Sequence, residues 1–445
     1  MDGEFTMDSV FDRRDFLKIS GIAGLGVTLG GSLPGRAAAR TMDKVRVGFV
    51  GVGGQGTSHL RNFLRIDGVE IKAVCDIVEE YAARAQDLAV KAGMPRPASY
   101  TQGERDYERL CAREDIDLVF NATPWRWHAP VCLEAMEQGK HAAVEVPAAV
   151  TIDECWSLVE TSEKTGLHCV MMENCCYDRV ELMVLNLVRK GILGELLHAE
   201  CGYLHDLRPV KFSDANEGLW RLDHSIRRNG DLYPTHGLGP VAQCMNINRG
   251  NLFDHMVSMS TKSRGLNLYA AEKFGPKSPQ AQLDYALGDV VTSLIRTRGG
   301  QTIVVTHDTN SPRPYSRDIL VQGTRGIARK YPEPKIHIEG RSPRHEWEDL
   351  IETYAAGFEH PLWRDLIQKA QGAGHGGMDY IEDYRLVQCL LRGEPMDMDV
   401  YDAAAISAVS ELSETSIANK SKTVDFPDFT RGKWRGREPL GIVSA

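Results

Sequence analysis

The stretch KVRVGFV at residues 44–50 runs directly into GVGGQG at residues 51–56, and this junction decides the first half of the fold. The first seven residues are mostly apolar, as in a strand buried within a parallel sheet. The next six fit G-x-G-x-x-G, a pattern that binds a dinucleotide where a strand turns into a helix. Helix-compatible sequence follows over residues 57–66, and a second apolar segment, residues 69–75, ends at Asp76.

Each part of this pattern has a mechanical role. Gly51 permits the tight turn, Gly53 lets the backbone approach a pyrophosphate, and Gly56 lets the helix pack closely on the strand. The start of the helix then offers unpaired N–H groups to the phosphates. The Asp76 carboxylate would accept hydrogen bonds from the adenosine ribose and repel a 2′-phosphate, which favours NAD over NADP. The alternative is a Gly-rich turn that has lost its ligand.

Strands and helices continue to alternate along the chain, which predicts a doubly wound parallel sheet of the Rossmann type over residues 43–175. The expected helices are 106–113, 125–138 and 151–165, and the expected strands are 118–123, 140–144 and 168–173. Ligands in such sheets bind beyond the carboxyl ends of the strands. The residues at those ends are 53–56, 76, 123–128, 145–147 and 174–177.

A different pattern begins after this region and predicts a second, substrate-binding domain over residues 176–445. Residues 198–205 read as a strand, and 289–296 and 301–309 read as two strands joined by a Gly-Gly turn. These features predict an α+β domain with a largely antiparallel, open sheet. Two late helices, 380–392 and 402–419, are expected to pack back onto the body, and an exposed sheet face would serve subunit contacts in a homo-oligomer.

The N-terminal segment, residues 1–39, has the layout of an export signal. Paired arginines at residues 13–14 precede an apolar, Gly-rich run, and three alanines at 37–39 offer a cleavage site. This arrangement resembles the twin-arginine signal, which predicts an exported, periplasmic protein. The alternatives are an uncleaved anchor and a chance basic pair.

Composition excludes several classes of protein. The 445 residues carry a formal charge of −9, and no basic patch indicates a nucleic-acid partner. No apolar stretch of transmembrane length follows the N-terminal segment, so no membrane span is expected in the mature form. None of the ten cysteines forms a C-x-x-C pair, and no H-E-x-x-H or EF-hand spacing occurs, so no metal site is expected.

Three later features resemble the glucose–fructose oxidoreductase/inositol dehydrogenase superfamily. They are a Thr-Pro strand end at 123–124, a Glu-x-Pro strand end at 145–147, and a later histidine, His236. Common members of that group are sugar dehydrogenases with a lysine inside the Glu-x-Pro motif and an aspartate four residues before the histidine. Val146 and Leu232 stand at those positions here, which argues against a simple dehydrogenase proton relay.

With these departures, the sequence resembles a narrower group, glycoside hydrolase family 109. The resemblance rests on WRWH at 125–128, EVP at 145–147, NCCY at 174–177 and YPTH at 233–236, behind a twin-arginine signal, and covers essentially the whole mature chain. It implies an NAD-dependent retaining glycosidase, typified by α-N-acetylgalactosaminidase. Such enzymes are exceptions to the usual mechanism with two carboxylates.

The resemblance also implies a reaction scheme. NAD takes a hydride from C3 of the sugar, a base removes the now acidic C2 proton, and the C1 substituent leaves by elimination. Water then adds, and the hydride returns to C3. The cofactor is recycled each turnover, so an exported enzyme needs only tightly bound NAD. The expected substrate is a small glycoside or the terminal sugar of a glycan.

Family resemblance assigns roles to particular side chains. Tyr177 is the expected catalytic base at C2, and His236 would assist the C3 hydroxyl proton or the leaving group. The expected substrate contacts are Tyr203, Arg221, Tyr233, Pro234, Thr235, His236 and Tyr315. The expected cofactor contacts are Gly51, Gly53, Gly54, Gln55, Gly56, Asp76, Asn121, Thr123, Trp125, Arg126, Trp127, His128, Glu145, Val146, Asn174 and Tyr233.

Two other functions stay open from the sequence. One is a periplasmic sugar dehydrogenase or epimerase of the same superfamily, which would release or exchange NADH. The other is a non-catalytic NAD or sugar sensor, which would have no need for a base such as Tyr177 or for His236.

Overall fold

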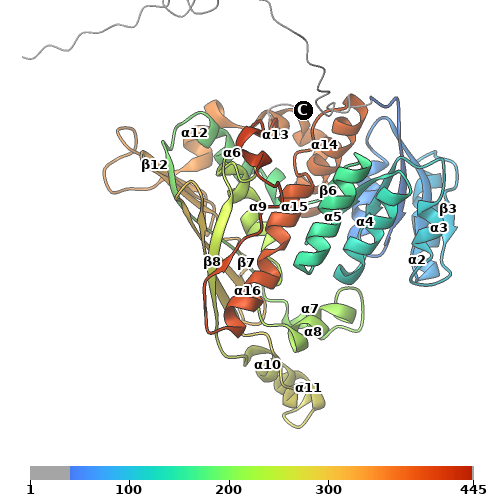
Figure 1. Ribbon diagram of the computed structural model, residues 1–445, viewed down its shortest axis with the longest axis horizontal. Coiled ribbons are helices and arrows are strands. Elements are labelled where there is room, and N and C mark those ends of the chain that lie inside the picture. The colour runs from blue at the N-terminus through green and yellow to red at the C-terminus, as the bar shows by residue number, and fades with distance from the viewer. Residues whose placement is uncertain (1–40, 443–445) are drawn as a thin grey trace, which may run out of the picture. The chain divides into compact units, whose positions relative to one another are not determined.

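The N-terminal part of the described chain is built on a six-stranded sheet in which every strand pair is parallel. The computed structural model describes residues 41–442 (Figure 1), so the expected export signal at residues 1–39 lies outside the described residues. The strand order is β3-β2-β1-β4-β5-β6, the order of the Rossmann fold. The strands are β1 (Val45–Val50), β2 (Val69–Cys75), β3 (Ala98–Tyr100), β4 (Leu118–Asn121), β5 (His141–Val144) and β6 (Cys169–Met171).

Helices connect these strands and cover the sheet. They are α1 (Gln55–Phe63), α2 (Glu79–Lys91), α3 (Tyr107–Cys111), η1 (Trp125–Trp127), α4 (His128–Glu137) and α5 (Ile152–Thr165). α4 packs beside α5, whereas α1 packs against a helix from the C-terminal part of the chain. The predicted Rossmann fold is therefore confirmed.

The second sheet has nine strands in the order β14-β13-β12-β11-β7-β10-β9-β8-β15. β7 and β10 pair in parallel, and the other pairs are antiparallel. The strands are β7 (Leu196–Leu204), β8 (Phe253–Ser260), β9 (Val290–Thr297), β10 (Thr302–Asp308), β11 (Leu320–Gly323), β12 (Gly326–Arg329), β13 (Lys335–Ile338), β14 (Glu348–Asp349) and β15 (Val424–Asp425). The predicted hairpin and the predicted, largely antiparallel sheet are confirmed.

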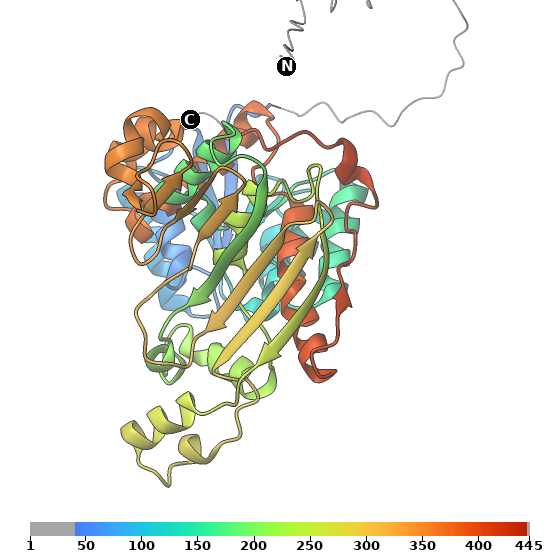
Figure 2. The same ribbon diagram turned by 90° about the vertical axis from the view of Figure 1, so that its left-hand side faces the viewer.

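One face of this sheet is open. Figure 2 shows the strands with helices behind them and none in front. Residues of β9 alternate between buried and exposed, as expected for a strand with one solvated face. Met259 and Leu294 are exposed apolar side chains of β8 and β9. A homo-oligomer formed through this face stays a prediction.

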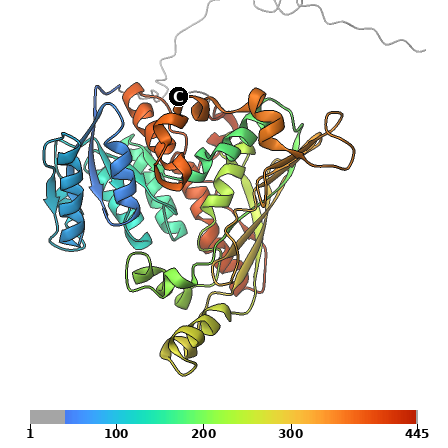
Figure 3. The same ribbon diagram turned by 180° about the vertical axis from the view of Figure 1, so that it is seen from behind.

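Most of the other helices of the C-terminal part lie between or beside the sheets, whereas α10 and α11 project from the body (Figure 3). The helices of this part are η2 (Asn174–Tyr177), α6 (Arg179–Arg189), α7 (Arg208–Lys211), α8 (Gly218–Arg227), α9 (Thr235–Cys244), α10 (Gly265–Phe274), α11 (Pro279–Gln282), α12 (Leu350–Phe358), α13 (Pro361–Ala370), η3 (Gly374–Gly377), α14 (Met378–Arg392), α15 (Val400–Ser407), α16 (Val409–Ala418) and η4 (Lys433–Gly436). α14 packs on α1, α15 on α5, and α16 on β8. The late helices thus return to both sheets, and the single helix expected over 402–419 is two helices that meet at Ala408.

Local sequence explains where several helices begin and end. The Thr151 side chain accepts a hydrogen bond from the backbone N–H of Glu154 and caps α5, and Gly166, with φ of 70°, ends that helix. Asp399 and Asp402 form a capping box at the start of α15. Over residues 41–442, no helix combines the length and the apolar character that crossing a bilayer would require.

Candidate active site

The Gly-rich turn after β1 is crowded at two of its glycines and open at a third. Gly51 has φ of +80°, and a Cβ there would lie 2.6 Å from the carbonyl oxygen of Ala122. A Cβ on Gly56 would lie 1.9 Å from the carbonyl oxygen of Gly51. By contrast, a Cβ on Gly54 would meet nothing within 4 Å, and α1 begins without a side-chain cap. The backbone N–H groups at this end therefore suit the diphosphate of NAD.

Asp76 braces this turn from the end of β2. Its two carboxylate oxygens accept hydrogen bonds of 2.9 Å from the backbone N–H groups of Val52 and Val78. Burial raises the pKa of Asp76. Arg84, which the sequence analysis did not single out, donates to the carbonyl oxygens of Val52 and Gly53 at 3.1 and 3.0 Å. The place of Asp76 at the end of β2 suits contact with the ribose of NAD, and that contact stays a prediction.

We expect Gly56→Ala to remove bound NAD. The added methyl group cannot fit beside the carbonyl of Gly51, so α1 must move away from β1 and the phosphate site opens. The nucleotide released from the purified, denatured variant measures the loss. Gly357→Ala is the matched control, because a Cβ at Gly357 meets nothing within 4 Å. Wild-type NAD content in Gly56→Ala would contradict this reading of the turn.

Three of the expected cofactor residues are held by polar contacts with the C-terminal part of the chain or with α1. Asn174 and Gln55 donate to the two carboxylate oxygens of Asp379 in α14, at 2.8 and 3.1 Å. Glu145, at the end of β5, lies 2.7 Å from Nε2 of His59 in α1. These contacts bring the ends of β5 and β6 and the start of α1 to one crevice.

His59 connects that crevice to α14. Its Nδ1 lies 2.8 Å from Asp383, and its side chain is fully buried. Burial alone would lower the pKa of His59, but Asp383 and Glu145 on its two sides raise it well above its usual value. The imidazolium is thereby stabilised between two carboxylates.

The four residues of the WRWH motif do different things. Trp125 is buried and stacks on Tyr233 with ring centroids 5.6 Å apart. Arg126 is exposed and pairs with Glu104 at 2.5 Å. Trp127 packs edge-on against Tyr107. Of the four, Trp125 is thus the one that joins the aromatic cluster described below.

The fourth, His128, belongs to a hydrogen-bonded loop with Asn121 and Thr123. The Asn121 amide donates to the carbonyl oxygens of Trp127 and His128, and its oxygen accepts from the Thr123 hydroxyl at 2.7 Å. Nε2 of His128 lies 2.8 Å from the carbonyl oxygen of Thr123, and Asn121 and His128 are buried. All three side chains therefore shape the end of β4, and direct contact with NAD stays a prediction for each.

Four expected substrate residues gather in one place. The ring of Tyr203 in β7 lies 4.6 Å from that of Tyr233 and 5.4 Å from that of His236, and the last two are 4.9 Å apart. The guanidinium of Arg221 in α8 lies 5.0 Å from the Tyr233 ring and 5.1 Å from the Trp125 ring. We call Tyr203, Arg221, Tyr233 and His236, with Trp125, the aromatic cluster.

The remaining expected substrate residues lie around this cluster. Tyr315 is partly exposed, its ring lies 6.2 Å from that of Tyr203, and its hydroxyl accepts from Arg317 at 3.3 Å. Pro234 is the residue before α9, and Thr235 is buried. Contact of each with a sugar stays a prediction.

Close packing of α9 on β7 explains why His236 and Tyr203 are neighbours. A Cβ on Gly237 would lie 2.3 Å from the backbone nitrogen of Gly202, so glycine is required for the two elements to come this close. His236 is the residue before Gly237, and Tyr203 is the residue after Gly202. The backbone contact between the two glycines therefore brings these side chains close together.

His236 is paired with a carboxylate that the sequence analysis did not assign. Its Nδ1 lies 2.8 Å from Oε1 of Glu173, which is fully buried after β6. Gly239 makes room, because a Cβ there would lie 2.8 Å from the Glu173 side chain. The superfamily pattern has an aspartate at the position of Leu232, and here Glu173 supplies a carboxylate from another element. The place of Glu173 at the carboxyl end of a parallel strand is the feature of the sequence that could have indicated a role in the site.

Tyr203 is paired with a second histidine, His205, whose Nδ1 lies 3.0 Å from the phenolic oxygen. Burial lowers the pKa of His205, with Arg221 adding to the effect, and burial raises the pKa of Tyr203 to about 12. A neutral imidazole with its proton on Nε2 accepts the phenolic hydrogen at Nδ1. His205 was also missed, although its spacing of two from Tyr203 places both on one face of an extended chain.

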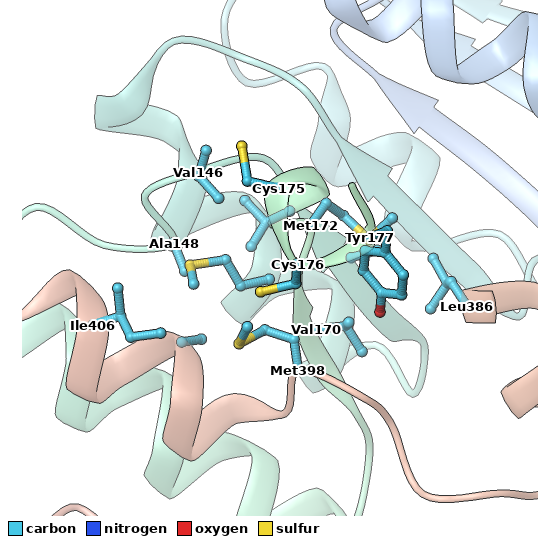
Figure 4. Packing of buried hydrophobic residues seen from close by; sticks show 14 of the residues in the cluster. Val146, Ala148, Val170, Met172, Cys175, Cys176, Tyr177, Leu386, Met398 and Ile406 are labelled. Carbon is cyan, nitrogen blue, oxygen red and sulfur yellow. The ribbon is translucent and has the colours of Figure 1, made fainter. Parts of the chain in front are cut away.

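Tyr177 does not lie in this cluster, which corrects the expectation that it is the base at C2. Figure 4 shows its ring beside Leu386 and Val170, with the oxygen directed away from Val146. The hydroxyl donates to the Asp397 carboxylate at 3.2 Å, and burial raises the pKa of Tyr177 well above its usual value. The ring is 5% exposed, and its burial in the core stabilises this direction of the side chain.

The Rossmann sheet, the Gly-rich turn and the aromatic cluster beside it define a protein of the NAD-binding oxidoreductase fold. Residues 45–173 match the oxidoreductase family with an NAD-binding Rossmann fold. Levoglucosan dehydrogenase in complex with NADH is similar in fold, with a TM-score of 0.67 and 20% identity over 86% of this chain and 99% of that chain. An inositol dehydrogenase homologue complexed with NAD⁺ from Azotobacter vinelandii gives a TM-score of 0.64 and 20% identity over 87% and 98%.

Residues 177–436 match the C-terminal domain of glycosyl hydrolase 109. A glycosyl hydrolase family 109 protein of Shewanella pealeana is 48% identical over 97% of this chain and 99% of its own length. One of Shewanella putrefaciens is 50% identical over 92% of this chain and 90% of its own. The chain belongs to glycosyl hydrolase family 109, and its cofactor is NAD.

Proposed function

We propose that this protein removes a terminal N-acetylgalactosamine-type sugar from a small glycoside or a glycan, with retention of configuration at C1. NAD held at the turn of residues 51–56 would supply the hydride acceptor and donor for C3 of the sugar. The observation that carries the proposal is the juxtaposition of two proton-transfer pairs, His236 with Glu173 and Tyr203 with His205, inside the aromatic cluster.

The His236 pair suits the proton of the C3 hydroxyl. The buried Glu173 carboxylate accepts a hydrogen bond from Nδ1–H of His236, which fixes the tautomer and leaves Nε2 able to act as a base. The negative charge of Glu173 also stabilises the imidazolium that forms when Nε2 takes a proton. His236 therefore accepts the hydroxyl proton as C3 is oxidised and returns it at the end.

The Tyr203 pair suits the proton at C2, which becomes acidic once C3 is a ketone. The Tyr203 hydroxyl donates to neutral His205, so the phenolic oxygen can take the C2 proton while its own proton moves to Nδ1 of His205. Arg221 and Tyr315 border the same space and offer donors to the sugar hydroxyl groups and the acetamido group.

Val146 argues against the alternative, a sugar dehydrogenase or epimerase. It stands where dehydrogenases of the superfamily carry a lysine, is 2% exposed, and offers no amine to a hydroxyl proton.

We also propose that the protein is exported through the twin-arginine route to the periplasm. That proposal rests on the paired arginines, the apolar run and the alanines of residues 1–39.

A screen of nitrophenyl glycosides, both anomers of each sugar, tests the activity. We expect nitrophenol release from an N-acetylgalactosaminide without net absorbance at 340 nm, because each hydride returns to the sugar. In D₂O the released sugar should carry deuterium at C2, because that proton exchanges with solvent through Tyr203. Steady accumulation of NADH from a free sugar, with no glycoside cleaved, would instead show a dehydrogenase.

A further inference from the structure

Three side chains of types that bind metals in proteins meet at the aromatic cluster. Glu173, Cys175 and His236 each offer one ligand atom, and the carboxylate oxygen, the sulfur and the ring nitrogen all lie within 4.8 Å of one another. Glu173 and Cys175 follow β6, His236 lies at the start of α9, and α9 packs on η2. The fold therefore assembles a ligand set that no local spacing in the sequence encodes.

The carboxylate of Glu173 is only half used by its neighbours. Its Oε1 accepts from Nδ1 of His236 at 2.8 Å and from the backbone N–H of Cys175 at 3.1 Å. Its Oε2 is buried and, within residues 41–442, has no hydrogen-bond partner. An unpartnered carboxylate oxygen is costly to bury, and a bound ion or water accounts for many such atoms.

Cys175 brings a sulfur atom to the same place. It is a free cysteine with no exposed surface, and its thiol makes only a weak hydrogen bond, at 3.3 Å, to Oδ1 of Asn174. Figure 4 shows the Cys175 sulfur on the side of Val146, whereas the sulfur of Cys176 is directed toward Met398. The two adjacent cysteines therefore face different surroundings, and the Cys175 sulfur is the one grouped with Glu173 and His236.

Nitrogen, sulfur and oxygen ligands in this combination suit Zn²⁺. Zinc in proteins is bound by histidine, cysteine thiolate and carboxylate, and three protein ligands leave a fourth position for water or a substrate oxygen. A thiolate and a carboxylate together balance the two positive charges of the ion, as a buried site requires. Ca²⁺ and Mg²⁺ prefer oxygen ligands alone and fit this set poorly.

We propose that Zn²⁺ binds to Glu173, Cys175 and His236 and inhibits this enzyme. Binding replaces the thiol hydrogen of Cys175 with a sulfur–zinc bond and releases one proton to solvent. It also replaces the hydrogen bond between Nδ1 of His236 and Glu173 with a nitrogen–zinc bond, and the Nδ1 proton is transferred to Nε2. The inference rests on the proposed function, because it names an inhibitor of the same site.

Inhibition follows from the position of that proton. The proposed reaction requires Nε2 of His236 to accept the hydroxyl proton of C3, but coordination at Nδ1 leaves Nε2 protonated and unable to act as a base. Zinc also engages the Glu173 carboxylate, which would otherwise stabilise the imidazolium. Zinc should therefore lower turnover without removing NAD from the turn after β1.

Cys175→Ser tests the site, because serine is similar in size and its hydroxyl is a poor ligand for zinc. Nitrophenol release is measured against the concentration of zinc sulfate, after metals and chelator have been removed and with a phosphine as the reductant. The half-inhibiting concentration should rise roughly 100-fold or more in the variant, because loss of a group that merely orients a ligand already costs about 10- to 100-fold in metal affinity. The activity of each protein without zinc is its own reference.

Cys176→Ser is the matched control. Cys176 is also buried and free, but its sulfur is not one of the three clustered ligand atoms. We expect the half-inhibiting concentration of the wild type. Equal zinc sensitivity of the wild type and Cys175→Ser, or loss of sensitivity in Cys176→Ser alone, would overturn the inference.

Binding of Co²⁺ gives a readout that needs no activity. Co²⁺ held by a thiolate absorbs in the near ultraviolet through charge transfer from the sulfur. We expect this band in the wild type and in Cys176→Ser, no band in Cys175→Ser, and weaker Co²⁺ binding in Glu173→Gln. The band also distinguishes the site from the buried cluster of His59, Glu382 and Asp383, which has no sulfur.

The outcomes separate this inference from the proposed function. A wild type that cleaves the glycoside, resists zinc and shows no cobalt band would refute the metal site and leave the glycosidase proposal standing. A wild type that shows the cobalt band but cleaves no glycoside would refute the proposed function and support the metal site.

Discussion

Tyr203→Phe is expected to lose roughly 10²- to 10⁴-fold in kcat on an aryl glycoside, the range attributed to general acid–base catalysis, while the protein keeps its NAD. Phenylalanine retains the ring contacts with Tyr233 and His236 and removes only the hydroxyl that bonds to His205. The C2 proton then has no acceptor, so deuterium incorporation at C2 in D₂O should fall together with turnover. Nitrophenol release and mass spectrometry of the released sugar measure both quantities.

Tyr177→Phe is the matched control for this prediction. The same hydroxyl is removed, but from a ring whose oxygen donates to Asp397 in the core. We expect turnover near that of the wild type and a free energy of unfolding lower by about 1 kcal/mol, the typical contribution of one hydrogen bond. The reverse pattern, an inactive Tyr177→Phe and an active Tyr203→Phe, would contradict the assignment of Tyr203.

Glu173→Gln is expected to reduce kcat by a similar factor, roughly 10²- to 10⁴-fold, with little change in NAD content. Glutamine has nearly the same shape, but it is neutral and its amide can donate to Nδ1 of His236. The wrong tautomer is then favoured, and the imidazolium loses the buried charge that stabilises it. Steady-state kinetics and the nucleotide content of the purified variant test both parts.

Glu382→Gln is the comparison for that change. Glu382 in α14 is also buried, and burial raises its pKa well above the usual range, which favours the neutral carboxyl group. Replacing a neutral acid by an amide leaves the charge unaltered, and we expect turnover to be retained. If Glu173→Gln were as active as Glu382→Gln, Glu173 would have no role in proton transfer by His236.

Much of the fold could be predicted because its signals are local. The apolar segments that became β1, β2 and β4, the turn at residues 51–56 and the hairpin between β9 and β10 are each encoded within a few adjacent residues. Backbone sterics and the period of burial act over that same range. The sequence also indicated that the ends of these strands meet, because parallel strands share one carboxyl edge.

The site was predicted less completely. YPTH indicated His236 and Tyr233, and family resemblance added Tyr203 and Arg221, which the structure brings together. The partners Glu173 and His205 were missed, and Tyr177 was given a role in the crevice that its position in the core does not support. Resemblance conveys which residue types recur, but it does not convey the direction of a side chain.

The sequence by itself thus determined the class of fold, the NAD-binding turn and the family. Only the tertiary structure decided that Tyr203 rather than Tyr177 lies beside His236, that Glu173 supplies the carboxylate paired with His236, and that Asp379 of α14 bonds to Gln55 at the start of α1. The physical reason is distance along the chain. These contacts join residues that are far apart in sequence, and their geometry follows from helix and sheet packing, such as that of Gly237 on Gly202, which no local pattern encodes.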